Sequence, residues 1–318
     1  MKPRLVFVHG VGGLRNTAAD LDEWMRALVM GAKAAGHSRR VSQLVYAGAV
    51  DVHFAYYGDL FTNGQAQGAA PEDGLSASAA LIELLLEAVD DRLAETDDAH
   101  ETRVLRRAKA QLAPEGEPQG AGDVVRRALN AANTLLALPG LSKIGGWVSA
   151  KVMLHQLGQV RRYLARKDAD GSGLGLDWRI RARVVQELNP AGPTVVVAHS
   201  LGTVVAFEAL HDYAGAVPLL VTLGSPIGMR TAVRPRMRPQ PLQVPAAVGN
   251  WLNFWDRDDF VVGQPQLEKF VAANSTSVLP VSRRVDSDGV WVHPAAKYLA
   301  TPGVAGPVIE ALEAATAA

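Results

Sequence analysis

Short apolar segments alternate with longer amphipathic segments near both ends of the chain. The apolar segments are rich in β-branched and aromatic residues and stop at a glycine or a polar turn; they are Leu5–Val8, Asp51–Tyr57, Thr194–Ala198, Leu219–Leu223 and Trp251–Trp255. Such segments are typical of strands buried in a parallel sheet. Segments with helical periodicity lie between them, at Asp20–Ala35, Ile180–Leu188 and Leu201–Tyr213. Strands that alternate with helices predict an α/β fold, with a mainly parallel sheet flanked by helices.

The alternation stops between about residue 61 and residue 175. This stretch contains no segment typical of a strand. Its periodicity instead predicts helices at Leu75–Leu93, Glu101–Leu112, Val124–Leu138 and Leu141–Arg166. We therefore expect two parts: an α/β core formed by residues 1–60 and 176–318, and a helical cap or lid inserted at residues 61–175.

Composition limits the functional classes without choosing one. The 318 residues are 48% hydrophobic and 20% charged, as in an ordinary globular protein. The 32 basic and 32 acidic side chains cancel, so the net charge gives no reason to expect nucleic acid as a partner. There is no cysteine, which excludes disulfides, thiolate metal sites and a cysteine nucleophile. We expect neither a metal nor a cofactor.

The sequence pattern gives no membrane or export signal. No apolar stretch reaches the roughly 18 residues that a transmembrane helix needs. The first apolar segment, Leu5–Val8, is too short for the core of a signal peptide. We therefore expect a soluble, cytoplasmic protein.

The strongest chemical signal is a serine between a strand and a helix. The segment Thr194–Thr203 has the sequence TVVVAHSLGT, in which a buried strand leads directly into Ser200 and a helix follows. Ala198 and Gly202, two positions before and after the serine, are small enough for a very tight turn. Such a turn exposes the hydroxyl above the sheet edge, beside the N–H of Leu201 and the positive end of the helix. The pattern predicts a nucleophile at Ser200 and an oxyanion donor at Leu201; the alternative is a serine that only caps a helix.

A serine hydroxyl needs a neighbouring base before it can act as a nucleophile. Two histidines follow the serine: His211 lies about three turns into the next helix, where it points away, and His293 lies in a loop before the last helix. His293 is the candidate base, because acid and histidine follow the serine along the chain in the α/β-hydrolases that have this kind of turn. For the carboxylate that orients the imidazole, the candidates follow the strand at Trp251–Trp255; they are Asp256, Asp258 and Asp259. We expect Asp286 and Asp288 to form turns instead.

A glycine-rich loop, His9-Gly10-Val11-Gly12-Gly13, follows the first strand. Glycines allow a backbone to approach a ligand closely and to adopt positive φ angles. The loop can therefore present backbone N–H groups to an oxyanion or to a phosphate. A dinucleotide site is not favoured, because the pattern G-x-G-x-x-G and the matching acidic residue are missing.

The segments Val8–Gly13 and Ala198–Gly202, followed by Asp259 and His293, resemble the α/β-hydrolase superfamily, in particular its serine esterase and lipase branch. The resemblance covers residues 1–60 and about 176–318 but not the helical insertion. It implies an α/β-hydrolase fold with a compact sheet of about six strands. One position departs from the usual motif, because alanine replaces glycine at Ala198.

The resemblance also implies roles for individual residues. The oxyanion donors would be the backbone N–H groups of Leu201 and Val11, with Gly12 as the alternative to Val11. In related hydrolases, β-branched residues closely follow the acid, which favours Asp259. Asp256, nearest the strand end, remains the alternative acid. Asp258 is expected to be solvated.

These residues predict a serine hydrolase that cleaves a carboxylic ester through an acyl-enzyme intermediate. Its substrate would be a small-molecule or lipid-like ester. The alternatives are a thioesterase or acyltransferase with the same triad, or a binding module without catalysis. The apolar cap segments Leu135–Leu141 and Ile144–Val148 would line an acyl pocket, contact a lipid surface, or only pack the cap onto the core. The arginines of Arg230–Arg238 would bind an anionic group or lie in a solvated loop.

Overall fold

A computed structural model describes residues 2–12, 16–61, 71–114, 121–138, 150–167, 169–171, 173–287 and 292–317. Gly13, Asp288 and the predicted cap segment Ile144–Val148 lie outside these residues. Within the described ranges, no helix is long and apolar enough to cross a membrane.

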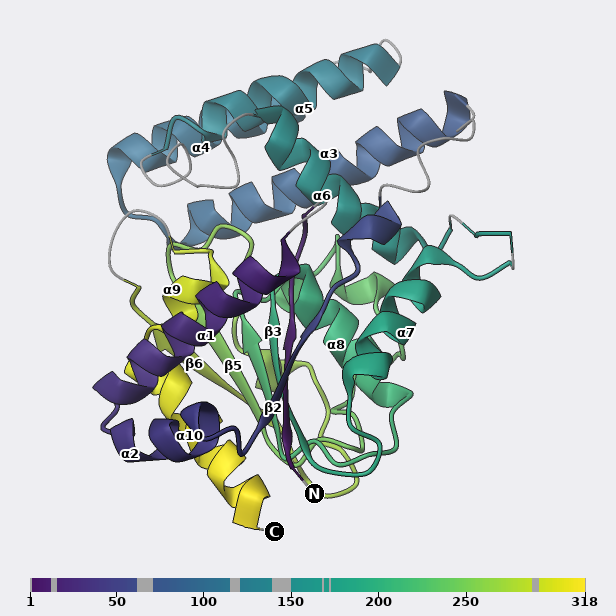
Figure 1. Ribbon diagram of the computed structural model, residues 1–318. Coiled ribbons are helices and arrows are strands. Elements are labelled where there is room, and N and C mark those ends of the chain that lie inside the picture. The colour runs from purple at the N-terminus through teal and green to yellow at the C-terminus, as the bar shows by residue number, and fades with distance from the viewer. Residues whose placement is uncertain are drawn as a thin grey trace.

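Six parallel strands form one sheet in the order β2-β1-β3-β4-β5-β6 (Figure 1). The strands are β1 (Arg4–Val8), β2 (Asp51–Ala55), β3 (Thr194–His199), β4 (Leu219–Leu223), β5 (Trp251–Asp256) and β6 (Pro280–Val285). The predicted α/β class and parallel sheet are confirmed. The strand order reverses direction between β1 and β3, so the carboxyl ends of these strands form the switch point where open parallel sheets usually bind ligands.

The sequence pattern does not identify β6, the last strand in the sheet order. β5 pairs with it from Trp251↔Pro280 to Asp256↔Val285. Three of its side chains, Val281, Arg283 and Arg284, are exposed. An edge strand with charged residues lacks the continuous apolar run that marks a strand buried on both faces.

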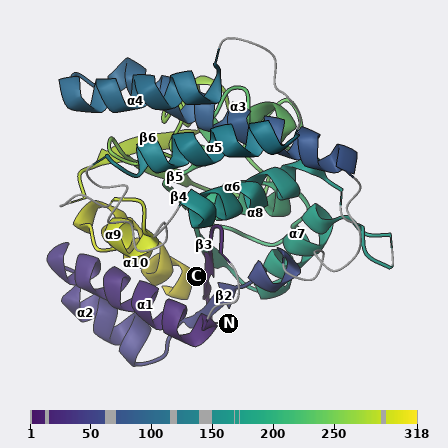
Figure 2. The same cartoon turned by 90° about the horizontal axis from the view of Figure 1, so that it is seen from above.

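Helices cover both faces of the sheet (Figures 1 and 2). One face packs against α1 (Thr17–Ala34), α2 (Ser38–Val41), the π-helix η1 (Ser42–Tyr46), α9 (Ala295–Leu299) and α10 (Pro302–Ala317), and the other against α7 (Leu176–Glu187) and α8 (Leu201–His211). In β1, Leu5 and Phe7 point to the face covered by α1, α9 and α10, and Val6 and Val8 point to the face covered by α7 and α8. All four are fully buried, as the two-residue period of a strand requires when both faces are covered.

The described part of the insertion is mainly helical and lies beyond the carboxyl ends of the strands, at the top of Figure 1. Its helices are α3 (Pro71–Glu95), α4 (Ala99–Leu112), α5 (Ala121–Leu135) and α6 (Ala150–Ala165), and short 3-10 turns elsewhere are η2 (Gly58–Phe61), η3 (Pro226–Gly228), η4 (Arg234–Arg236) and η5 (Leu267–Lys269). Apolar side chains of the cap, such as Leu85, Leu105 and Met153, join the core that contains Val6 and Ala198. The cap is therefore packed directly onto the sheet edge at which β1 and β3 end.

Candidate active site

Ser200 lies at the sharp turn between β3 and α8. Its backbone has φ 53° and ψ −130°, a conformation that L-residues rarely adopt and that costs about 1–3 kcal/mol. The N–H of Ser200 donates to the carbonyl of Leu223 at 3.0 Å, which ties the turn to β4. A Cβ at Gly202 would overlap the carbonyl oxygens of Val8 and His9, so the chain needs glycine there. Gly202, two positions after the serine, thus allows the loop after β1 to pack against the turn.

The side chains of Ser200, His293 and Asp259 form one hydrogen-bonded row. Nε2 of His293 lies 3.2 Å from Oγ of Ser200, and Nδ1 lies 2.9 Å from both carboxylate oxygens of Asp259. The Asp259 side chain is fully buried, whereas that of His293 is 18% exposed. Loops at the carboxyl ends of β3 and β5 and before α9 bring these residues together. An Nδ1–H that donates to a carboxylate leaves Nε2 available to accept a proton from the serine.

Asp259 is held as a carboxylate by its surroundings. Tyr298 donates its OH to Oδ2 at 2.7 Å, and the N–H of Val261 donates to Oδ1 at 3.2 Å. Burial raises the pKa of Asp259, but the charge on His293 and these hydrogen bonds outweigh burial and hold the pKa below its ordinary value. Burial, together with the charge on Asp259, raises the pKa of Tyr298 well above its usual range. At neutral pH, Asp259 is therefore ionised and Tyr298 is protonated.

The other two carboxylates near the end of β5 have different partners. Asp256 is buried, and its oxygens accept backbone N–H groups from two loop residues at 2.9 and 2.6 Å. Asp258 is exposed and pairs with Arg92 of α3 at 2.8 Å. Of the two acids that the sequence leaves open, Asp259 is therefore the one whose side chain contacts His293.

Two further histidines, His9 and His211, pack within the fold. The ring of His9 is fully buried, accepts the N–H of Tyr57 at 3.2 Å and stacks on the Tyr57 ring with 4.2 Å between centroids. His211 ends α8, and its ring lies 4.9 Å from that of Phe207 in an edge-on contact. Burial lowers the pKa of His211. His9 therefore supports the loop after β1, and His211 lies at the opposite end of α8 from the serine.

The glycine-rich loop after β1 runs directly beside Ser200. A Cβ at Gly10 would lie 2.7 Å from the Cβ of Ser200, so this close approach requires glycine. Val11 lines a cavity together with the serine and the histidine of the row. The N–H of Gly12 instead donates to Gln159 of α6 at 2.8 Å. That hydrogen bond occupies one of the two predicted donors and leaves Val11 as the candidate from this loop.

Three residues that the sequence pattern did not identify support the row. His199 donates from Nε2 to the carbonyl of His293 at 2.6 Å, and the two rings lie 4.6 Å apart. Tyr298 accepts the N–H of Asp256, at the end of β5, at 3.1 Å while it donates to Asp259. Gly224 passes so close to the acid that a Cβ would lie 2.5 Å from Oδ2. Only His199 has a local signal, its place next to the serine; the other two act across loops that are distant in sequence.

The cavity over Ser200 is small and mostly apolar. Its volume is about 30 Å³, which is room for little more than one water molecule. Leu84 of α3, Leu157 and Val160 of α6, and Pro226 and Met229 of the loop after β4 form most of its wall. Helices α3 and α6 of the cap therefore close the site.

The arginine-rich loop after β4 docks the cap helix α3. Glu87, only 7% exposed, accepts the backbone N–H groups of residues 230–232. Glu83 and Asp91, one turn away on either side, pair with two arginines of this loop at 2.8 and 3.1 Å. Arg230 and Arg236 of this loop thus pair with the cap, whereas Arg238 is exposed, as expected for a solvated loop.

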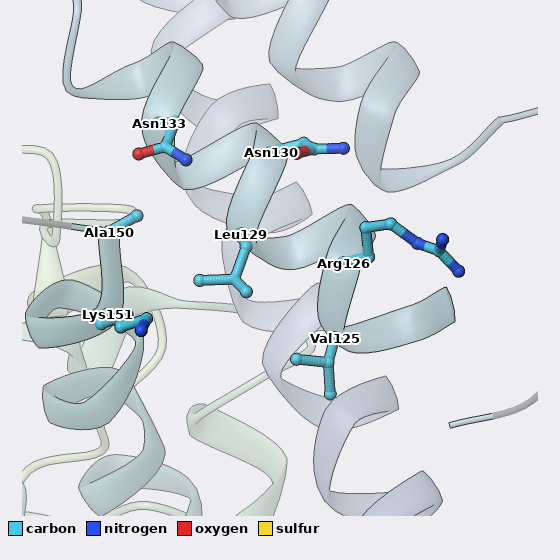
Figure 3. Close-up of a pocket in the computed structure, with 7 residues that line it drawn as sticks. All are labelled: Val125, Arg126, Leu129, Asn130, Asn133, Ala150 and Lys151. Carbon is cyan, nitrogen blue, oxygen red and sulfur yellow. The ribbon is translucent and has the colours of Figure 1, made fainter. Parts of the chain in front are cut away.

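A larger hollow of about 640 Å³ lies between α5 and the start of α6 (Figure 3). Its lining residues are Val125, Arg126, Leu129, Asn130, Asn133, Ala150 and Lys151. They offer amide and basic groups but no hydroxyl, histidine or carboxylate, and none of them lines the cavity over Ser200. The candidate chemistry therefore lies at the smaller cavity.

Comparisons with protein-family models, with curated proteins and with solved structures found no match to this chain. Among the described residues, no group of three or more histidine, aspartate or glutamate side chains could hold a metal ion. Function is therefore inferred from the geometry around Ser200.

Proposed function

We propose that this protein is a serine hydrolase with an α/β-hydrolase fold, and that it cleaves a carboxylic ester through an acyl-enzyme intermediate. The observation that carries the proposal is the hydrogen-bonded row of Ser200, His293 and Asp259, which suits a nucleophile, its base and an orienting carboxylate. The strained backbone at Ser200 supports it, because such strain clusters at functional residues. The position of the row supports it as well, since ligands bind at the switch point of open parallel sheets.

In the first half-reaction, Oγ of Ser200 attacks the ester carbonyl carbon while Nε2 of His293 takes the hydroxyl proton. The ionised Asp259 stabilises the imidazolium that forms. The N–H groups of Leu201 and Val11 would bind the oxyanion; Leu201 opens α8, so its N–H has no partner within the helix and lies at the positive end of the helix dipole. The tetrahedral intermediate then breaks the ester C–O bond, and the departing alcohol takes the proton from His293.

In the second half-reaction, a water molecule attacks the acyl group on Ser200 and gives its proton to Nε2 of His293. Collapse of this intermediate returns the proton to Oγ and releases the carboxylic acid. The apolar cavity wall favours a small-molecule or lipid-like ester with an apolar acyl part. Because about 30 Å³ cannot hold such a group, we expect the cap to move when the substrate binds.

A fluorophosphonate probe tests the nucleophile, because it reacts covalently with activated serines. The wild-type chain should be labelled, and Ser200→Ala should not. Ser225→Ala is the matched control: Ser225 is also buried and follows a strand, but its hydroxyl lies 2.7 Å from that of Thr203 and accepts the N–H of Ile227. Equal labelling of wild type and Ser200→Ala would contradict the proposal.

A panel of p-nitrophenyl esters of increasing chain length tests the substrate class. We expect hydrolysis, with a preference that reports how much acyl chain the opened site accepts. Turnover of thioesters alone, or acyl transfer to an added alcohol without hydrolysis, would favour the thioesterase or acyltransferase alternative. A labelled Ser200 with no turnover of any acyl compound would favour the binding module.

A further inference from the structure

Gln159 of α6 forms a paired contact with the loop after β1. The N–H of Gly12 donates to Oε1 of Gln159 at 2.8 Å, and Nε2 of Gln159 donates to the carbonyl of Gly12 at 3.2 Å. Gln159 is only 2% exposed and lies 147 positions from Gly12 along the chain. A cap helix therefore holds the backbone of the loop that carries the candidate oxyanion donor.

The conformation of Gly12 explains why the loop needs this support. Gly12 has φ 153°, a value that side-chain-bearing residues rarely adopt. It lies outside any helix or strand, so no regular element supplies partners for its N–H and C=O. Buried backbone groups without partners are costly. A glutamine amide both accepts and donates within one planar group, so Gln159 satisfies both groups of Gly12 at once.

Val11 lies between two such clamps. On its N-terminal side, the OH of Tyr57 donates to the carbonyl of His9 and lies 3.3 Å from the carbonyl oxygen of Gly10. In a trans peptide unit the C=O and N–H point in opposite directions, so the Val11 N–H points away from the Tyr57 hydroxyl. On the C-terminal side, Gln159 holds the peptide units of Gly12. The loop that carries the donor is thus held by Tyr57 from the core and by Gln159 from the cap.

We propose that Gln159 is a positioning residue for the oxyanion site, so that the cap contributes to catalysis as well as covering Ser200. This inference rests on the proposed hydrolase function and on Val11 as a donor. Preorganised donors stabilise a developing oxyanion because they need no rearrangement during the reaction. Releasing the loop therefore lowers kcat and leaves KM nearly unchanged, since the interaction is made in the transition state.

Tyr163 of the same helix provides a matched control. It is fully buried and donates its OH to Glu208 of α8 at 2.6 Å. Tyr163→Phe removes one buried hydrogen bond between α6 and α8 and leaves the contacts of Gln159 unchanged. It therefore reports what loosening the helix does without a change at Gly12.

The test compares Gln159→Met, Gln159→Glu and Tyr163→Phe in the full chain. The measurements are kcat and KM for a p-nitrophenyl ester, the melting temperature, and hydrogen–deuterium exchange of the peptide that covers residues 5–12. For Gln159→Met, we expect kcat to fall about 10- to 100-fold, with KM within about threefold of wild type and faster exchange in the loop. Tyr163→Phe should lower the melting temperature and keep kcat within about threefold of wild type.

Each outcome decides between the two levels of inference. If wild type reacts at Ser200 and Gln159→Met retains the kcat of Tyr163→Phe, the positioning role is wrong and the hydrolase function stands. If wild type does not react at Ser200, both are wrong. Should Gln159→Met fail to fold, Gln159→Glu replaces it, because its carboxylate still accepts the Gly12 N–H but cannot donate to the carbonyl; an unchanged kcat in that variant likewise contradicts the role.

Discussion

Asp259→Asn separates the two candidate acids most directly. In the wild type, Oδ1 of Asp259 accepts the N–H of Val261, and Oδ2 accepts the OH of Tyr298. The backbone N–H cannot turn away, whereas the hydroxyl can, so the amide oxygen should take the Oδ1 position and the NH₂ the Oδ2 position. Nδ1 of His293, which lies 2.9 Å from two carboxylate oxygens in the wild type, would then lie at that distance from one N–H group and one amide oxygen.

The expected loss of activity follows from this arrangement. The substitution removes the charge that stabilises the imidazolium, and it admits the tautomer in which Nδ1 accepts from the NH₂ group and Nε2 already carries a proton. A ring in that tautomer cannot take the proton of Ser200, whereas the wild-type carboxylate allows only the productive tautomer. We expect kcat to fall about 10³- to 10⁴-fold, which is about 4–5.5 kcal/mol of activation free energy.

Asp256→Asn is the matched control, because it makes the same change at the other buried carboxylate, three positions earlier at the end of β5. The oxygens of Asp256 accept two backbone N–H groups, so the variant should lose about 1–3 kcal/mol of unfolding free energy. Its kcat per folded molecule should stay within about threefold of wild type. The assay is the initial rate of p-nitrophenyl ester hydrolysis, normalised to the folded fraction from circular dichroism. Equal losses in the two variants would show that Asp259 is not the orienting acid.

Tyr298→Phe removes a donor from the buried Asp259 and should lower the free energy of unfolding at pH 7 by about 1.5–3 kcal/mol in urea denaturation; no change would show that this hydrogen bond is not stabilising. The pKa of Asp259 in the folded state lies below its unfolded value of about 3.9, so its ionisation stabilises the fold above that value. The stability advantage of wild type over Asp259→Asn should therefore shrink as the pH falls from about 5 through the folded-state pKa, and a constant difference would contradict this. Gly10→Ala places a Cβ 2.7 Å from that of Ser200 and should slow fluorophosphonate labelling about tenfold or more, with an unchanged far-ultraviolet circular dichroism spectrum. Glu87→Gln turns an NH₂ group toward backbone N–H donors and should speed proteolytic cleavage within α3, whereas Asp91→Asn, whose arginine partner is 52% exposed, should change it little.

The sheet could be predicted from sequence where its strands are buried on both faces. Phe7 and Val197, for example, pair across β1 and β3 within continuous apolar runs. The strand Pro280–Val285 carries no such run, because it pairs with β5 alone and exposes charged side chains. Burial, not strand formation itself, therefore determines which strands the apolar pattern can identify.

The site could be predicted where its signal is local in the chain. Ser200 has such a signal, because the strand, the small neighbours and the helix are contiguous. Asp256 and Asp259 share one local pattern, and only the course of the loop decides which of them faces His293. Gln159 joins the site across a long separation in sequence, so no local pattern could identify it.

The two cap helices that close the cavity have unequal attachments. Helix α6 is joined to the core at two places. Its Gln159 bonds Gly12, and Tyr163, together with Arg166 just after the helix, bonds Glu208, which is 3% exposed. Removing a partner from a buried charged group costs about 3–5 kcal/mol, because the remaining charge is left uncompensated. Displacement of α6 would also release Gln159 and hence the loop beside Ser200.

Helix α3 buries apolar side chains such as Leu85 in the core, and its polar attachments are mainly groups that water can reach. Glu83 and Asp91 pair with arginines that are 39% and 52% exposed, and exposed pairs of this kind contribute about 0–1 kcal/mol each. Glu87 is held more firmly, but Arg230 and Thr231, two of the residues that donate to it, are exposed, so water can replace those hydrogen bonds as the helix lifts. We therefore expect α3 to move when a substrate enters and α6 to remain docked, so that the oxyanion loop stays formed while Ser200 becomes accessible.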